Sequence, residues 1–350
     1  MQTRSGSVYP KPDTEYYSPP SRKRRIVAVD FFDGLPDDLV LSVLSKISSS
    51  AHAPSDVVSI TMTCKRMNEL GTNPMVLSKA SVRSMAVRAK KWSDSADRFL
   101  KRCADAGSLE AAYTLGMIKF YCLDSRSAGA ALMARAAMGS HAAALYSLAI
   151  VQFNGSGGCK AHKDLRAGVA LCARSAFLGH VDALRELGHC LQDGYGVRRN
   201  VAEGRRFLLQ ANARELAEAA PPATCQGQIH QQQQVRSDFG CDVPLAEPHP
   251  ANRFMAEWFA AAARRKEVEA GGLRLCSLAR CGRPETRRHE FRRCSVCGTV
   301  NYCSRACQAL HWRLAHKSEC VPMEQWADAA AAVAAANADL AVADGGNVND

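Results

Sequence analysis

The chain has 350 residues, of which 47% are hydrophobic and only 7% aromatic, with 15 cysteines and a formal net charge of +11. This length leaves room for two or three domains, and because alanine supplies much of the apolar count, we expect close-packed helices rather than sheets. The odd cysteine count and the lack of an apolar secretory signal in residues 1–20 argue against a disulfide-bonded secreted protein and favour an intracellular one, in the nucleus, the cytoplasm or both.

The first segment, residues 1–30, is polar, and we expect it to be disordered. It carries a short basic run at 21–25 (Ser-Arg-Lys-Arg-Arg). Such a run serves as a nuclear import signal in some proteins and is only a solvated basic patch in others. The sequence leaves both interpretations open.

Residues 31–78 have the pattern of a compact helical unit. Proline and two acids at 35–38 suit a first helical turn, and apolar residues recur at helical spacing over 39–47. A polar loop at 48–55 is expected to precede a second helix that ends at Gly71. Two short amphipathic helices bury little surface alone, so the unit needs a third helix or a partner.

This pattern resembles the F-box, the adaptor-binding motif of SCF ubiquitin ligases. The match covers Leu-Pro-Asp-Asp-Leu-Val from Leu35, the apolar run to Ile47, and the second helix up to Met67, which stands where the family commonly has tryptophan. The resemblance implies binding to a Skp-type adaptor and through it to a cullin. The residues expected to contact the adaptor are Leu35, Pro36, Leu39, Val57 and Ile60. An ordinary helical hairpin packed on the next domain is the alternative.

Residues 79–102 are expected to form a connecting helix, with an apolar face through Val82, Met85, Ala89 and Trp92.

Residues 103–217 contain an internal repeat, visible as three aligned segments at 110–116, 143–149 and 182–188. The matching leucines lie 33 and 39 residues apart. A period of this size, with alanine and glycine where helices cross, predicts a short α-solenoid. The pattern resembles Sel-like repeats, which are relatives of tetratricopeptide repeats, and implies a curved surface that binds another protein. The Gly-rich turns are not phosphate loops, because no Gly-Lys-Ser/Thr follows them.

Two further segments flank the cysteine-rich region. A Gln/Pro-rich linker is expected at 218–250, followed by an amphipathic helix at 251–270 that docks between the repeats and the finger. The Ala-rich tail at 321–350 is interrupted by aspartate and asparagine, so we expect no membrane span there.

Seven cysteines and one histidine between Cys276 and Cys320 form the most informative pattern of the chain. Eight soft ligands in 45 residues suit two closed tetrahedral zinc sites. A disulfide knot is disfavoured by the expected reducing compartment. A RING finger is disfavoured because its ligand order has an early Cys-x2-Cys and an internal histidine. A catalytic zinc is disfavoured because eight ligands leave no open position for water.

The spacing over residues 276–320 resembles the MYND-type zinc finger, a module that docks proline-containing peptides. The resemblance implies two interleaved structural Zn²⁺ sites. The first would be held by Cys276, Cys281, Cys303 and Cys307, and the second by Cys294, Cys297, His316 and Cys320. His311 is a rival ligand because it lies four residues after Cys307, whereas His289 falls outside the ligand frame.

The positive charge of the chain suggests nucleic-acid binding. The charge of the zinc ligands weakens this interpretation. Residues 276–320 hold nine Lys/Arg and three Asp/Glu, a formal +6. Seven thiolates and two Zn²⁺ would change this by −3, to about +3. A nucleic-acid partner is therefore not expected.

No arrangement of residues suited to catalysis is found: the chain lacks a Gly-x-Ser-x-Gly elbow, a His-Glu-x-x-His motif and a dinucleotide fingerprint. Together the resemblances imply a plant-type F-box protein that acts as the non-catalytic substrate-recognition subunit of an SCF-type ligase, with the repeats and the finger binding an unknown protein substrate. A nuclear scaffold or transcriptional co-regulator acting through the finger is the alternative.

Overall fold

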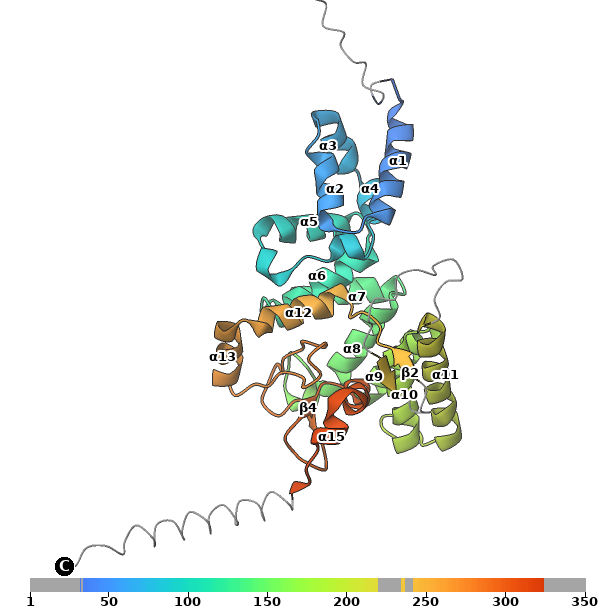
Figure 1. Cartoon of the computed structure of the whole chain (residues 1–350), viewed down its shortest axis with the longest axis vertical. Coiled ribbons are helices and arrows are strands. Elements are labelled where there is room, and N and C mark those ends of the chain that lie inside the picture. Colours follow the sequence, from blue (N-terminus) through green and yellow to red (C-terminus); the bar gives the residue numbers. More distant parts are fainter. Residues whose placement is uncertain (1–31, 33, 220–233, 237–241, 324–350) are drawn as a thin grey trace, which may run out of the picture.

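The structure is a computed structural model that describes residues 32, 34–219, 234–236 and 242–323. It is mainly helical, as expected, and its described strands form only two short antiparallel pairs. Figure 1 shows the N-terminal helices at one end of the molecule and the finger toward the other. The segments expected to be disordered at 1–30 and in most of the linker and tail lie outside the described residues. Among the described helices, none has both the length and the hydrophobicity of a membrane span.

The N-terminal unit has four short helices where the sequence predicted two. They are α1 (Asp37–Ser50), α2 (Pro54–Thr61), α3 (Lys65–Gly71) and α4 (Pro74–Ser78). The expected loop at 48–55 is shorter, because α1 continues to Ser50 and α2 begins with proline at its first position. The expected second helix breaks before Lys65, since Cys64 adopts an extended backbone and its sulfur accepts the Met67 N–H at 3.4 Å.

The connecting helix expected at 79–102 is not continuous. Two single-turn 3₁₀ helices, η1 (Arg83–Met85) and η2 (Ala89–Lys91), precede α5 (Asp94–Asp105). Serine side chains explain the interruption. Ser81 accepts the Ser84 N–H at 3.1 Å, and Ser93 caps the start of α5, so both serines offer the backbone an alternative to a continuous helix.

Three helical hairpins follow α5 and confirm the expected repeats. They are α6 (Leu109–Tyr121) with α7 (Arg126–Met138), α8 (Ala142–Asn154) with α9 (Leu165–Phe177), and α10 (Val181–Asp193) with α11 (Val201–Ala219), with a short turn η3 (Lys160–His162) before α9. Glycine permits the close approach inside each pair. A Cβ on Gly129 would lie 2.5 Å from the Phe120 backbone nitrogen, so no larger residue fits there.

The segment after the repeats begins with the hairpin β1 (Gln234–Arg236) and β2 (Asp242–Pro244). The single helix expected at 251–270 is two helices, α12 (Pro250–Ala260) and α13 (Ala262–Ala270), because the backbone of Ala261 is extended. Helix α12 packs on α6 and η2, and its Phe254 meets Trp92 edge-to-face at 5.2 Å. On its other side the finger contacts α12 so closely that a Cβ on Gly282 would lie 2.3 Å from the Ala256 nitrogen.

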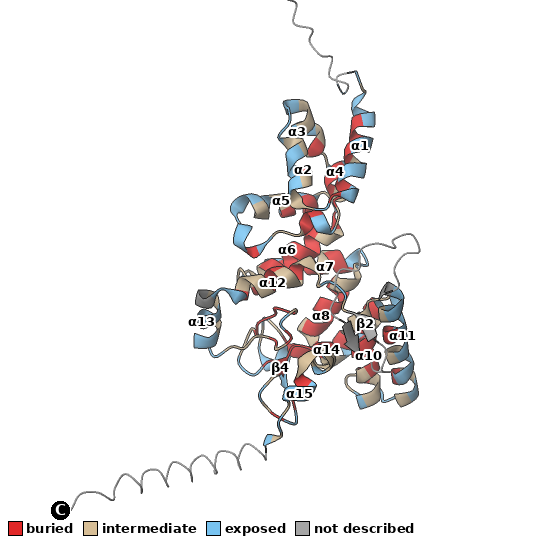
Figure 2. Ribbon diagram, in the orientation of Figure 1, coloured by how far each residue is buried: buried red, intermediate tan, exposed pale blue. Residues whose placement is uncertain are grey.

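The finger contains little regular structure. Its elements are β3 (Arg292–Arg293), β4 (Asn301–Tyr302), α14 (Arg305–His311), the π-turn η4 (Trp312–His316) and α15 (Lys317–Glu319). Its buried side chains join those of α8, α9 and α10 in a single hydrophobic cluster. Figure 2 shows buried residues running along the inner helices of the repeats and into α14. The second and third repeats and the finger therefore share one core.

Candidate metal centre

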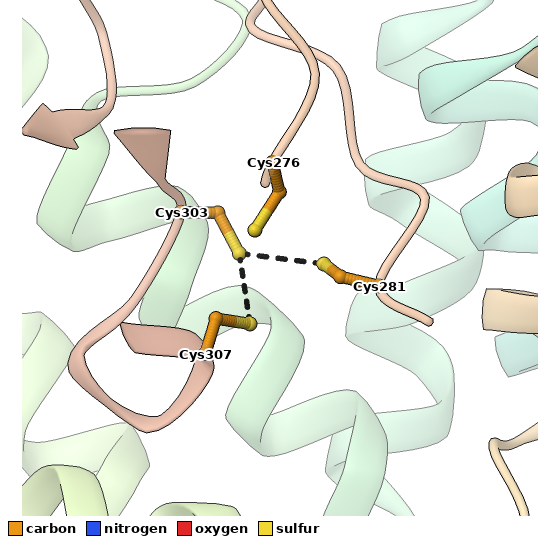
Figure 3. Close-up of side chains that lie close together, drawn as sticks. All are labelled: Cys276, Cys281, Cys303 and Cys307. Atoms are coloured by element: carbon orange, nitrogen blue, oxygen red, sulfur yellow. Dashed lines mark hydrogen bonds between the residues drawn. The ribbon is translucent and has the colours of Figure 1, made fainter. Parts of the chain in front are cut away.

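The structure places the eight cysteine and histidine residues of the finger in two groups of four. The four ligand atoms of each group lie within 4.8 Å of one another. Group 1 contains Cys276, Cys281, Cys303 and Cys307, and group 2 contains Cys294, Cys297, His316 and Cys320. Figure 3 shows the four sulfur atoms of group 1 converging from separate segments of the chain. Each group could hold one zinc ion.

The distances inside the groups suit zinc and not disulfides. In a tetrahedral site with Zn–S bonds of about 2.3 Å, two sulfurs lie about 3.8 Å apart. The Cys303 sulfur lies 3.5 Å from those of Cys281 and Cys307, and the Cys294 and Cys320 sulfurs are 3.9 Å apart. A disulfide requires about 2.05 Å. The donor set and its spacing therefore fit two four-coordinate zinc ions.

Local structure explains how distant ligands of group 1 meet. Ser304 caps α14 by accepting the Cys307 N–H at 3.0 Å, which holds Cys303 just before the helix and Cys307 in its first turn. The Cys276 N–H donates to the Arg283 carbonyl at 2.9 Å, which closes the loop that carries Cys281. The group thus joins two segments of the chain, since Cys281 and Cys303 are 22 positions apart in the sequence.

The π-turn η4 decides between the two candidate histidines. It adds a residue to the helical path between His311 and His316, and the His316 Nε2 atom lies 3.5 Å from the Cys297 sulfur. His311 instead lies 2.9 Å from the Tyr302 hydroxyl through its Nδ1 atom, and its ring stacks on His316. His289 is exposed with a positive φ of 59°, outside both groups. The π-turn itself was not predicted from the sequence.

Each group contains one thiol whose pKa is lowered by its neighbours. Hydrogen bonds from the neighbouring cysteines, led by Cys276, hold the pKa of Cys281 well below its usual range. For Cys297, burial opposes ionisation, but hydrogen bonds from Thr299 outweigh it and lower the pKa to about 6. In group 1, burial raises the pKa of Cys276, and hydrogen bonds with the neighbouring cysteines raise that of Cys307. Because zinc binds thiolates, metal binding must displace the protons that these thiols retain.

Arg283 connects group 1 to the repeats, a role that the sequence did not reveal. Its side chain is buried, one Nη atom lies 3.8 Å from the sulfurs of Cys281 and Cys303, and the other donates to the Ser147 hydroxyl on α8 at 2.9 Å. Burial alone would lower the pKa of Arg283, but the two cysteine sulfurs raise it well above the usual value. The positive charge of Arg283 therefore offsets the negative charge of a zinc–tetrathiolate centre.

Polar side chains of the repeats complete the interface with the finger. Glu186 of α10 accepts the backbone N–H groups of Arg305 and Ala306 at 2.7 and 3.1 Å, where α14 begins. Glu215 of α11 accepts two hydrogen bonds from Arg313, both at 3.2 Å. Asn154 of α8 donates to the Cys303 carbonyl at 2.9 Å. The finger is thus fixed to its own repeats by charged and polar contacts.

The residues expected to bind the adaptor lie in different environments. Val57 is only 1% exposed, so it belongs to the core of the N-terminal unit and is not available to a partner. Leu35 and Ile60 are half-buried and pack against that core, whereas Pro36 and Leu39 are exposed. The apolar residues of the run 39–47 divide between two faces of α1: Val40, Leu41 and Leu44 are buried, and Leu39, Val43 and Ile47 are exposed.

Two family profiles match the chain. The profile described as plant tetratrico peptide repeats matches residues 82–175, and that of the MYND finger matches residues 276–320. The second match covers the whole ligand pattern from the first to the last cysteine.

Two curated relatives from Arabidopsis thaliana match most of the chain. F-box protein At1g67340 is 58% identical over 340 residues, covering 89% of this chain and 89% of the relative. F-box protein At5g50450 is 59% identical over 302 residues, covering 86% and 88%. Among solved structures, a Sel1 repeat protein from Oxalobacter formigenes aligns with 24% identity and a TM-score of 0.30, covering 33% of this chain and 86% of that one.

Proposed function

We propose, since the chain belongs to the family of the Arabidopsis F-box proteins At1g67340 and At5g50450, that it is the substrate-recognition subunit of an SCF-type ubiquitin ligase. In this proposal α1–α4 form an F-box that binds a Skp-type adaptor and, through it, a cullin. The repeats and the MYND finger bind the target protein. The chain has no active site of its own and acts inside the cell, in the nucleus, the cytoplasm or both.

The outward apolar face of α1 is the observation that carries this proposal. Leu39, Val43 and Ile47, spaced by four residues, are 53%, 38% and 39% exposed. Soluble proteins rarely leave contiguous apolar surface uncovered, so this face is suited to a protein partner.

The architecture supports simultaneous binding of an adaptor and a target. Figure 1 shows α1–α4 at one end of the molecule and the finger far from them. A chain that holds both partners raises the local concentration of the target at the ligase without any chemistry of its own.

The eight ligands of the two groups hold two structural zinc ions in this proposal. Both sites have four protein ligands, so the metal supplies folding energy and not a reactive water. Group 1 would link the start of the finger to α14, and group 2 would link the β3–β4 region to the end of the finger.

An open groove between the last repeat and the finger offers a surface for the target. It has a volume of about 560 Å³ and lies between α11 and the α14–η4 segment. Leu208 and Leu209 form one side, and Gln308, Ala309 and Trp312 form the other. Because the two sides come from different domains, the groove depends on the fixed interface between the repeats and the finger.

Adaptor binding tests the proposal directly. Val43→Asp places a charge in the exposed apolar face of α1 without entering the core, and we expect at least a tenfold loss of affinity for a purified Skp-type adaptor. Ser42→Asp, at a neighbouring exposed position, should bind the adaptor like wild type. Circular dichroism should show that both variants remain folded.

Two results would contradict the proposal. One is a wild-type chain that fails to bind the adaptor in co-expression. The other is a Val43→Asp variant that binds as tightly as wild type. Either result, together with finger-dependent binding of nuclear proteins, would favour a scaffold that works through the finger.

A further inference from the structure

The inner surface of the repeats is occupied by other parts of the chain itself. A cavity of about 580 Å³ lies there, lined by the starts of α8 and α10, by the finger and by the chain's own segment 245–249. Within this segment, His249 lies 2.8 Å from Glu110 on α6. The last residues of the outer helices α7 and α9, in contrast, are exposed. A further partner of the repeats is therefore better sought on their outer side.

The capping residues define equivalent positions in successive repeats. The inner helices α6, α8 and α10 each begin after a side chain that accepts a backbone N–H, at positions 108, 141 and 180. Six positions before each cap the chain has an arginine: Arg102, Arg135 and Arg174. Three positions before each cap the residue changes from acidic to apolar: Asp105, Met138 and Phe177.

The first of these acidic residues compensates an arginine of the next repeat. Arg135 lies 3.5 Å from the Asp105 carboxylate. One repeat further, the same register places Arg174 beside Met138, which offers no charge. Ser175 donates to the Ala142 carbonyl at 2.7 Å, so the end of α9 does pack where α8 begins, just after the turn that follows Met138. The arginine is thus kept while its acid is replaced by an apolar side chain.

Apolar side chains and arginines are neighbours on this outer side. Phe177 is 89% exposed, Met138 77% and Leu178 44%. Arg174 lies three and four residues before Phe177 and Leu178 on α9, so the three side chains share one face. On the other side, a Cβ on Gly179 would lie 2.4 Å from an Nη atom of Arg214, so this guanidinium lies against the turn after Leu178. We call the five side chains the outer patch: Met138, Arg174, Phe177, Leu178 and Arg214.

The positive charges of the outer patch are not compensated within the part of the chain that the structure describes. Arg174 and Arg214 are exposed, and neither has a described carboxylate within ion-pairing distance. Glu215, next to Arg214 in the sequence, pairs instead with Arg185 at 2.9 Å and also lines the inner cavity, as does Asp182. The patch therefore combines apolar surface with two cations and no acid of its own.

We propose that the outer patch binds a segment of another protein that carries acidic residues beside a large apolar side chain. The apolar side chain would pack on Phe177 and Leu178. The carboxylates would pair with Arg174 and Arg214, as Asp105 pairs with its arginine inside the chain. A basic segment fits poorly, because like charges would face each other. The inference goes beyond the proposed function, since the patch contains no residue of α1–α4, of the metal groups or of the groove beside α11.

Labelled peptide pools test the proposal on the full zinc-loaded chain. The probes are random dodecapeptides whose two central positions are fixed as Leu-Glu, Leu-Gln or Leu-Lys, and the readout is fluorescence polarisation at low salt. We expect the Leu-Glu pool to bind about fivefold more tightly than the Leu-Gln pool, the effect of two exposed ion pairs, and the Leu-Lys pool to bind weakest. Phe177→Ser should weaken binding of the Leu-Glu pool about fivefold, because the apolar contact is lost.

Charge variants distinguish the outer patch from other basic surfaces of the chain. The double variant Arg174→Gln/Arg214→Gln should bind the Leu-Glu and Leu-Gln pools equally. Met138→Asp should also reduce the preference, because it gives Arg174 the acid that the preceding arginine already has. The matched control is Arg135→Gln/Asp105→Asn, which removes the compensated pair and should leave the preference unchanged.

Equal binding of the three pools by the wild-type chain, or a preference for Leu-Glu that persists in Arg174→Gln/Arg214→Gln, would overturn the inference. The substituted residues of the patch are exposed, so circular dichroism should show that these variants remain folded. Adaptor binding by the same preparations should match that of the wild type, which separates failure of this inference from failure of the proposed function.

Discussion

The two metal groups use nearly the same ligands but differ in their surroundings. Every ligand of group 1 is buried, and Cys281 and Cys303 lie against Arg283, which contacts α8. In group 2 Cys320 is only half-buried, and the hydrogen bonds of the ligands run within the finger, such as that between Cys297 and Thr299 at 3.1 Å. Group 1 is thus tied to the repeats by polar contacts, whereas the described hydrogen bonds of the group 2 ligands lie within the finger.

The finger is therefore a zinc-binding module of its own that also shares buried contacts with the repeats. The buried cysteines of both groups lie in the cluster that contains the buried residues of α8, α9 and α10, but the described hydrogen bonds to α8 run from group 1, through Arg283 and Asn154. Losing the metal of group 1 should therefore disturb the repeats as well as the finger. Losing the metal of group 2 should have a local effect.

The largest effect is expected from Cys303→Ser compared with Cys320→Ser. Structural zinc contributes about 10–16 kcal/mol in isolated fingers, so each variant should lose one zinc per chain by elemental analysis. Only Cys303→Ser should speed hydrogen exchange in α8 and α10, because the described hydrogen bonds from the metal groups to α8 run from group 1. Equal exchange in the two variants would show that the groups are equivalent.

Arg283→Met tests the difference between group 1 and group 2 without removing a metal ligand. It leaves the thiolates of group 1 and the Ser147 hydroxyl without their buried cationic partner, which should cost about 3–5 kcal/mol of unfolding free energy. Urea denaturation measures the loss. Arg293→Met, at an exposed position near group 2, should change stability by less than about 0.5 kcal/mol. A loss of less than about 0.5 kcal/mol of unfolding free energy for Arg283→Met would mean that the negative charge of group 1 does not need the Arg283 cation.

Glu110→Gln tests a contact that needs no metal. Burial favours the neutral acid, but hydrogen bonds from His141 and His249 outweigh it and lower the pKa of Glu110 from 4.5 to about 2. A lowered pKa stabilises the fold above about pH 4.5, and this contribution is lost as the pH falls toward about 2. Wild type should exceed the variant by about 3 kcal/mol at pH 6, and the two should converge at pH 2.

The control for this profile is Glu203→Gln, which removes only an exposed ion pair with Arg206 and should show little pH dependence. Chelating zinc should leave the Glu110 effect in place, because its partners His141 and His249 lie outside the finger. A Glu110 effect that disappears with the metal would show that the contacts of Glu110 depend on group 1.

Glu186→Gln should have the smallest effect, about 1–3 kcal/mol, because an amide oxygen still accepts from the start of α14 but the charge is lost. Thermal unfolding with and without Cys303→Ser gives a double-mutant cycle. The cost should nearly vanish in the Cys303→Ser background, where the interface is already open. Full additivity would place the Glu186 contact outside the part of the interface that group 1 maintains.

Short-range patterns of the sequence predicted the repeats and the set of candidate ligands well. Glycine and alanine recur at fixed positions because paired helices need close approach, as at Gly129, and this requirement is the same in every repeat. Continuous helices were predicted less well. The breaks at Cys64 and Ala261, and the π-turn before His316, depend on caps and packing that periodicity does not record.

Spacing along the chain is enough to identify the repeats and the side chains that can bind zinc. Which surfaces remain free follows from tertiary packing, which buries Val57, exposes Val43 and places Arg283 between the cysteine sulfurs and α8. These outcomes depend on which element packs against which, and contacts between residues more than 100 positions apart leave no local pattern in the sequence.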